Sequence, residues 1–172
     1  MNRLPPHYIE LERVYARTLG QGVRSLAVAA AESGEGVTLL AGALAQRNEL
    51  AGRSTLLVYF PQAPETDSSP APAPESVSDF GTLPSCIRRS SDGHATLVGP
   101  ICWDENLALR NSSHVAERIE TWLESFDAII FDTPPLNTRN GGQVPAESIC
   151  AACEGTLVVV LACRTPAASI SA

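Results

Sequence analysis

Phe126-Asp127-Ala128-Ile129-Ile130-Phe131-Asp132-Thr133-Pro134-Pro135 carries the clearest structural signal in the chain. Its apolar run at 128–131 predicts a buried strand, because a strand that is apolar on both faces belongs inside a sheet covered by helices. Asp132 and the two prolines that follow Thr133 predict that the strand stops in a stiff turn. Other apolar runs predict strands at 25–30, 54–60, 95–98 and 156–162, and a weak strand at 83–88.

Helical patterns alternate with these strands. The spacing of apolar residues predicts helices over 8–19, 37–50, 113–125 and about 145–153. The first would bury positions 8, 11, 15 and 19. Asn111 is expected to cap the helix at 113–125, with an inner face of Val115, Ile119, Trp122 and Leu123. The alternation predicts an α/β fold: a doubly wound, mostly parallel sheet with helices on both faces.

The composition predicts a single domain over residues 1–172, since this length can bury a core and 44% of the residues are hydrophobic. Residues 61–78 are rich in proline, alanine and serine, which predicts a flexible insertion. The net charge of −7 argues against a nucleic-acid partner, which requires clustered basic residues. A cytoplasmic location is expected, since the sequence shows neither a membrane-spanning run nor a signal-peptide core.

A glycine loop, Ser33-Gly34-Glu35-Gly36-Val37-Thr38, stands between the first strand and the helix at 37–50. Glycines let backbone N–H groups approach a phosphate at a helix N-terminus, and a threonine hydroxyl can hold Mg²⁺. Asp132 is expected beside this loop, because parallel strands end at one edge of a sheet. The pattern predicts a phosphate-loop (P-loop) NTPase fold. Candidate nucleotide-binding residues are Gly34, Glu35, Gly36, Val37, Thr38 and Leu39, and candidate Mg²⁺ ligands are Thr38 and Asp132.

The lysine that precedes the threonine in such loops is replaced by Val37, and the chain contains no lysine at all. A charged hydrogen bond of this kind contributes about 1.5–3 kcal/mol, or about 10- to 150-fold in affinity. Its loss should weaken phosphoryl transfer further, since charge stabilisation dominates that catalysis. ATP or ADP with Mg²⁺ is therefore one candidate cofactor, and no cofactor is the other. An ordinary strand–turn–helix connection is the alternative, because Gly-x-Gly turns are common.

Cys150 and Cys153 form a C-x-x-C pair in a helical stretch. A zinc site would need a second pair or histidines at suitable spacing, and the sequence shows neither. We therefore expect both cysteines to act as small apolar residues.

Four stretches together resemble one known family. The loop at 33–38 is similar to P-G-E-G-K-[ST], 54–61 to V-L-L-V-D-x-D, 126–135 to Y-D-x-[VI]-I-[IVF]-D-T-P-P, and 152–160 to A-D-G-x-[IL]-[LV]-V-V. The chain thus resembles the cytoplasmic domain of bacterial tyrosine kinases of the capsule and exopolysaccharide type, in the MinD/ParA-like group of P-loop ATPases. The resemblance runs over residues 10–166.

The chain departs from the family at the residues that carry its chemistry. Besides Val37, the two aspartates of D-x-D fall at Tyr59 and Pro61, so Asp132 is the acidic position that remains. The C-terminal tyrosine cluster of the family is absent, and a further helix and strand are expected after residue 166. In the first helix, Glu10, Arg13 and Arg17 partly match the E-x-x-R-x-x-R motif that the family uses for ring assembly, which makes them candidate oligomer contacts.

The resemblance and its departures imply a non-catalytic regulator or scaffold in exopolysaccharide or capsule biosynthesis and export. Its expected partner is an inner-membrane polysaccharide co-polymerase or another export protein, which would hold it at the inner-membrane face; homo-oligomer formation is also open. A nucleotide sensor with weak ATP or ADP binding is the second hypothesis. A MinD/ParA-like positioning ATPase is the third, and the acidic charge and Val37 disfavour it.

Overall fold

The computed structural model describes residues 5, 7–60, 87–89, 93–98, 103–137, 144–162 and 165. The insertion predicted at 61–78 lies outside the described residues. The elements follow in the order α1 (Ile9–Arg17), the 3₁₀ helix η1 (Leu19–Gln21), β1 (Ser25–Ala30), α2 (Val37–Leu50), β2 (Thr55–Tyr59), β3 (Ile87–Arg89), β4 (Ala95–Val98), α3 (Trp103–Ala108), α4 (Ser112–Leu123), β5 (Ala128–Asp132), α5 (Ala146–Ala152) and β6 (Gly155–Val159).

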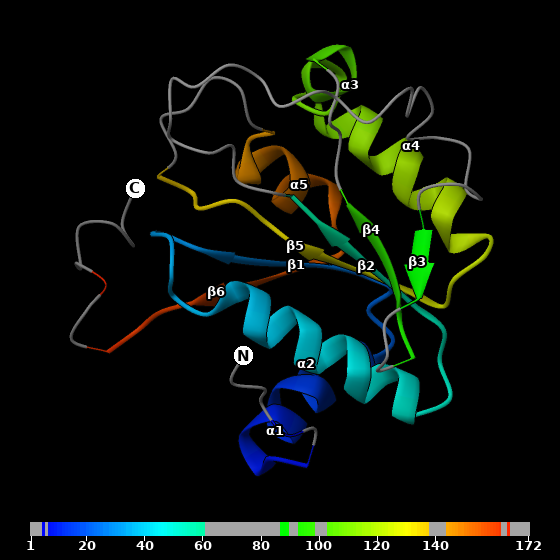
Figure 1. Cartoon of the computed structure of the whole chain (residues 1–172), viewed down its shortest axis with the longest axis vertical. Coiled ribbons are helices and arrows are strands. Elements are labelled where there is room, and N and C mark those ends of the chain that lie inside the picture. Colours follow the sequence, from blue (N-terminus) through cyan, green and yellow to red (C-terminus); the bar gives the residue numbers. More distant parts are fainter. Residues whose placement is uncertain are drawn as a thin grey trace.

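The described strands form one six-stranded sheet in the order β3-β4-β2-β5-β1-β6 (Figure 1). All pairings among β4, β2, β5, β1 and β6 are parallel, whereas β3 runs antiparallel to β4 at one edge. The predicted α/β fold with a mostly parallel sheet is confirmed. Because β5 lies between β1 and β2, its last residue, Asp132, comes to the same edge as the loop that follows β1.

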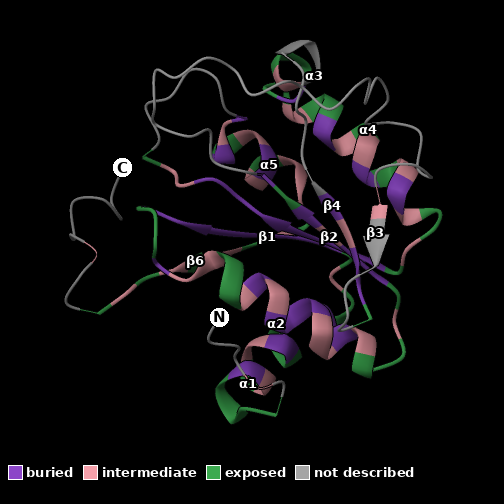
Figure 2. Ribbon diagram, in the orientation of Figure 1, coloured by how far each residue is buried: buried purple, intermediate pink, exposed green. Residues whose placement is uncertain are grey.

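Helices cover both faces of the sheet. Helices α1 and α2 lie on one face, and α4 and α5 lie on the other (Figure 1). The central strands β1 and β5 are buried along their whole length (Figure 2). Alternate residues of the strands point to opposite faces, so Leu56 and Val58 belong to the core under α4 and α5, while Val28 and Ile130 belong to the core under α1 and α2.

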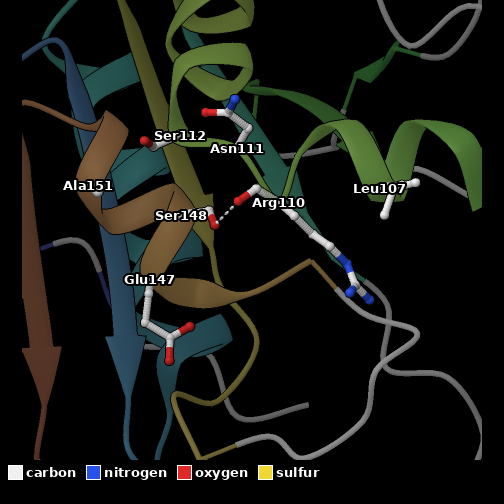
Figure 3. A pocket seen from close by; sticks show the side chains of 7 residues that line it. All are labelled: Leu107, Arg110, Asn111, Ser112, Glu147, Ser148 and Ala151. Atoms are coloured by element: carbon white, nitrogen blue, oxygen red, sulfur yellow. Dashed lines mark hydrogen bonds between the residues drawn. The ribbon is translucent and has the colours of Figure 1, made fainter.

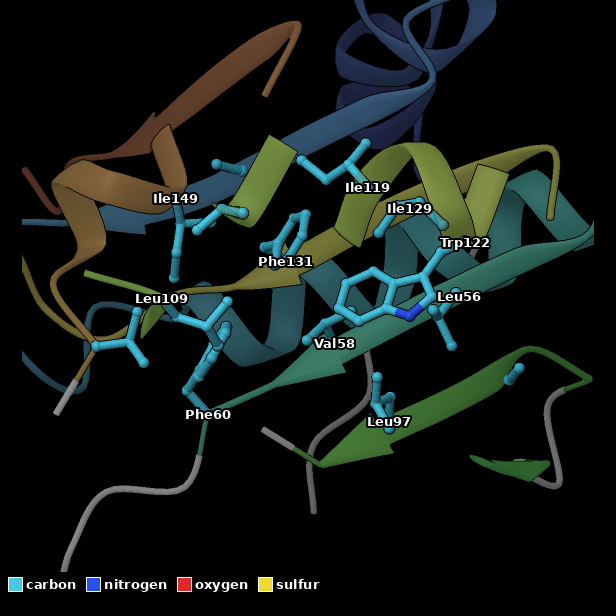
Figure 4. Packing of buried hydrophobic residues seen from close by; sticks show 14 residues of the cluster. Leu56, Val58, Phe60, Leu97, Leu109, Ile119, Trp122, Ile129, Phe131 and Ile149 are labelled. Atoms are coloured by element: carbon cyan, nitrogen blue, oxygen red, sulfur yellow. The ribbon is translucent and has the colours of Figure 1, made fainter. Parts of the chain in front are cut away.

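Helix α4 confirms the prediction made for residues 113–125. The side chain of Asn111 caps it by accepting a hydrogen bond from the Ser113 N–H at 3.0 Å. Trp122 is 2% exposed, and its ring lies 6.1 Å from the ring of Phe131, which in turn lies 6.4 Å from Phe60 (Figure 4). Aromatic pairs of this kind add about 0.5–1.5 kcal/mol to the burial term. Of the predicted inner face, three residues are buried and one is partly buried: Val115, Ile119, Trp122 and Leu123.

Helix α1 is attached to α2 through polar contacts. The Glu12 carboxylate accepts two hydrogen bonds from the guanidinium of Arg47, which also lies 4.3 Å from the centre of the Tyr15 ring. The Tyr15 hydroxyl donates to Asn48 at 3.2 Å, and the Asn48 amide donates to the Thr55 hydroxyl at 2.9 Å. These contacts join α1, α2 and β2, and they fix the C-terminal half of the helix that begins at the glycine loop.

Some local predictions differ from the structure. Positions 11, 15 and 19 are buried as expected, but Tyr8 is 50% exposed because it is the N-cap residue that precedes α1. The sequence pattern does not predict α3, since six residues are too few to show a helical period. The weak strand predicted at 83–88 overlaps β3, whose described part begins at Ile87.

Candidate functional site

The loop between β1 and α2 has a backbone conformation that suits an anion. Gly34 and Gly36 have φ values of 80° and 93°, in a left-handed region that residues with a Cβ atom rarely adopt. Gly36 is the N-cap residue of the 14-residue helix α2, so the free N–H groups of the first turn open at the loop. The partial positive charge of a helix N-terminus adds to their attraction for a phosphate.

Thr38 and Asp132 lie together at the carboxyl edge of the sheet. Thr38 lies in the first turn of α2, near enough to Asp132 for its hydroxyl to favour the charged form of that carboxyl group. Asp132 is 4% exposed, and its Oδ2 atom has no hydrogen-bond partner among the described residues. Burial raises the pKa of Asp132 to about 6, although the nearby Thr38 hydroxyl opposes this shift. A hydroxyl beside a buried carboxylate oxygen that lacks a partner suits Mg²⁺, which prefers oxygen ligands.

The loop positions Val37 and Leu39 contribute no charge. Val37 packs against the core under α1 and α2, and Leu39 is 37% exposed on the next part of the helix. The position at which the resembling family has a lysine therefore carries a partly buried apolar side chain. The structure brings the six predicted loop residues and Asp132 to one edge, but it supplies no positive side chain from the loop itself.

Glu35 is the loop residue whose position the sequence did not explain. Its side chain is buried, at 5% exposure. One carboxylate oxygen accepts a hydrogen bond from the Glu32 N–H at 3.1 Å, and the other accepts one from the hydroxyl of Thr165. No pattern in the sequence predicts the second contact, because its partners are 130 residues apart.

Tyr59 stands where the resembling family has an aspartate. It is paired in register with Asp132 on the neighbouring strand β5, and it is 36% exposed. Residues paired in register in parallel strands project to the same face. A phenol group, rather than a second carboxylate, is therefore the neighbour of Asp132 on β2. Pro61 lies outside the described residues.

The remaining sequence predictions concern surfaces. Glu10, Arg13 and Arg17 are all exposed on α1, where they are available for contact with another molecule, and their role in an oligomer stays a prediction. Within the described residues no group of three or more histidine, cysteine or acidic side chains is placed to hold a metal ion, and no helix is long and apolar enough to cross a membrane.

Cys150 and Cys153 pack against the core under α4 and α5. Burial raises the pKa of both thiols, to about 12 for Cys153. A reactive cysteine needs an accessible thiolate at neutral pH. The environment of this pair therefore suits packing rather than redox chemistry.

A pocket of about 560 Å³ lies between the N-terminal end of α4 and helix α5 (Figure 3). Arg110, Glu147 and Ser148 are among the residues that line it. The Ser148 hydroxyl donates to the carbonyl oxygen of Arg110 at 2.7 Å, which ties α5 to the turn before α4. None of the predicted site residues lines this pocket, so it is separate from the glycine loop.

The chain is similar to known proteins in structure rather than in sequence. No family model and no curated protein sequence matches the chain. The kinase domain of the Escherichia coli tyrosine kinase ETK is similar with a TM-score of 0.66 and 13% identity, over 93% of this chain and 64% of that domain. The chimerical protein CapA2B2 is similar with a TM-score of 0.71 and 20% identity, over 96% of this chain and 77% of that one.

The BceF tyrosine kinase domain is also similar, with a TM-score of 0.67 and 16% identity over 98% of this chain and 72% of that domain. The chain thus has the fold of bacterial tyrosine kinase domains, as its four matching sequence stretches predicted. It spans about two thirds to four fifths of the length of these domains. At such identities the similarity concerns the fold, and the chemistry has to be judged from the side chains of this chain.

Proposed function

We propose that this chain is a non-catalytic relative of the bacterial tyrosine kinases that acts as a regulator or scaffold in exopolysaccharide or capsule biosynthesis and export. The observation that carries the proposal is the placement of Val37: the residue at the lysine position of the loop is a partly buried apolar side chain that packs against the core under α1 and α2. Phosphoryl transfer depends on charge placed against the phosphates. The proposed partner is an inner-membrane polysaccharide co-polymerase or another protein of the export system.

The residues at the candidate Mg²⁺ site support the same proposal. If Mg²⁺ binds here, Thr38 and Asp132 would hold it, and the metal would neutralise charge on a bound phosphate chain. The neighbouring position on β2 offers the phenol of Tyr59 in place of a carboxylate. A site that has lost a lysine and a metal-directing carboxylate can keep its backbone shape while losing the groups that speed the reaction.

Activity assays with the purified protein test this function. Phosphate release from Mg·ATP and phosphotyrosine formation are expected to equal the rates without protein. Thr38→Ala provides the matched control, because it removes the hydroxyl that a catalytic metal would need. Turnover by the natural chain that disappears in Thr38→Ala would contradict a non-catalytic role.

A nucleotide sensor is the second candidate function, and the loop conformation favours it. The N–H groups at the start of α2 and the left-handed glycines need no lysine to contact a phosphate. Calorimetric titration with Mg·ATP and Mg·ADP at low salt separates the two candidates. Saturable micromolar binding without turnover would indicate a sensor, whereas no heat up to millimolar nucleotide would indicate a scaffold that keeps only the shape.

A further inference from the structure

The chain that follows β5 stays hydrogen-bonded to the end of β1 and to the start of the glycine loop. The Thr133 N–H donates to the carbonyl oxygen of Val28 at 3.1 Å. The Leu136 N–H donates to the carbonyl oxygen of Ala30 at 2.9 Å. The two residues between Thr133 and Leu136 are prolines, whose rings fix their φ angles. The segment after β5 is therefore a stiff continuation of the pairing between β5 and β1.

Asn137 makes the last contacts of this continuation. Its N–H donates to the carbonyl oxygen of Ala31 at 3.1 Å, and its side-chain amide donates to the Glu32 carboxylate at 3.0 Å. Glu32 stands two residues before Gly34, the first left-handed glycine of the loop. Asn137 thus holds the first part of the loop through both its backbone and its side chain.

These contacts join the two halves of the candidate site. Asp132, the last residue of β5, is the candidate metal ligand, and its buried Oδ2 atom has no hydrogen-bond partner among the described residues. The loop that begins after β1 and the first turn of α2 form the candidate phosphate-binding half. A metal ion in such a site also contacts the phosphates, and functional groups of this kind have to be held within about 0.5 Å of their working positions. The segment from Thr133 to Asn137 is the direct connection that can set this separation.

We propose that Asn137 is a positioning residue that holds the glycine loop in register with Asp132, so that Mg²⁺ and a phosphate group bind cooperatively. It acts through Ala31 and Glu32 rather than by contact with the ligand. The proposal rests on the second candidate function, phosphate binding at the loop. Because such coupling is reciprocal, the factor by which Mg²⁺ tightens phosphate binding measures it.

Calorimetric titration with inorganic pyrophosphate, with and without Mg²⁺, gives this factor as a ratio of two affinities. Asn137→Ala removes the side-chain donor, and we expect the ratio to fall about threefold, as for loss of one surface hydrogen bond. Asn137→Asp places a carboxylate against that of Glu32, and we expect a fall of about tenfold, since like charges at this range repel each other. Both side chains are exposed, so urea unfolding is expected to show nearly the same stability for each variant as for the natural chain.

The matched control reverses the hydrogen bond and keeps the total charge. In Asn137→Asp combined with Glu32→Gln, the new amide at position 32 donates to the new carboxylate at position 137, and we expect the natural ratio to return. Glu120→Gln removes a charge from the exposed face of α4, and we expect it to leave the ratio unchanged.

The same titrations contain the results that would overturn the proposal. Equal ratios in the natural chain, Asn137→Ala and Asn137→Asp would show that Asn137 positions nothing. A ratio that stays low in the reversed pair would assign the effect of Asn137→Asp to charge alone. The absence of pyrophosphate binding by the natural chain would defeat both the sensor and the positioning role, and the scaffold role would survive. Turnover of Mg·ATP would defeat the non-catalytic role, whereas the ratios would still decide the role of Asn137.

Discussion

Asp132→Asn is expected to change how the stability of the protein depends on pH. Asp132 is buried at the end of β5, and burial raises its pKa from 3.8 to about 6. Because the folded state binds this proton more tightly than the unfolded state, the contribution of Asp132 to stability is complete below pH ~4 and is lost as the pH rises through about 6. At about 1.4 kcal/mol for each tenfold change in proton affinity, the loss is about 3 kcal/mol.

The assay is urea unfolding followed by tryptophan fluorescence at several pH values between 4 and 8. Subtracting the unfolding free energy of Asp132→Asn from that of the natural chain cancels the other titrating groups. We expect this difference to fall by about 2–3 kcal/mol between pH 4 and 7, and to be flat above that. The unpartnered buried amide of the new asparagine shifts the difference by a constant, so it leaves the slope unaffected.

Asp127→Asn is the matched control at the other end of the same strand. Hydrogen bonds from the side chain and backbone of Ser54 lower the pKa of Asp127, which is exposed. Its contribution is therefore present above its unfolded pKa and is lost as the pH falls, the opposite sign to Asp132. A pH-independent difference for Asp132→Asn, or the same sign for both variants, would refute the assignment of Asp132 as a buried carboxyl group with a raised pKa.

Three other substitutions probe the loop and the two cores. Val37→Lys is expected to tighten binding of Mg·ADP by about 10- to 150-fold in calorimetry without producing phosphate release from Mg·ATP. Measurable turnover of Mg·ATP would show that the lysine alone was missing. Tyr15→Phe leaves the Oδ1 atom of the buried Asn48 without its donor, so urea unfolding should show a loss of about 1–3 kcal/mol. Trp122→Ala empties the centre of the core under α4 and α5 and should cost about 3–5 kcal/mol in the same assay, with pyrophosphate binding unchanged in the folded protein.

The sequence predicts those parts of the fold that depend on near neighbours. Strand β1 coincides with the predicted range 25–30, since every one of its residues is buried and small or apolar. Helix α2 coincides with 37–50, because left-handed glycines stand directly before it. The Asn111 cap is likewise local, with its partner two residues away. The candidate site at the carboxyl edge follows from these elements and from the general rule that parallel strands end together.

The parts that the sequence does not predict depend on contacts between distant residues. Glu12 pairs with Arg47, which lies 35 positions away in the sequence, and Glu35 pairs with Thr165, which lies 130 positions away. No periodicity in the sequence predicts either contact. Burial of Asp132 beside the loop that opens α2 requires the order of β1, β5 and β2 in the sheet, which the alternation of helices and strands does not specify. The raised pKa of that carboxyl group therefore follows from the tertiary structure and could not be predicted from the sequence.

The fold and the chemistry of such a site are encoded by different residues. Apolar strands and two left-handed glycines are enough to place the loop, and none of them carries charge, so the loop keeps its shape when Val37 and Tyr59 replace charged residues. Restoring a lysine at position 37 would add attraction for phosphate, but it would not supply a second carboxylate beside Asp132 to position a metal. Binding and turnover should therefore separate in Val37→Lys, and that separation is what distinguishes a site that has lost several catalytic groups from one that has lost a single charge.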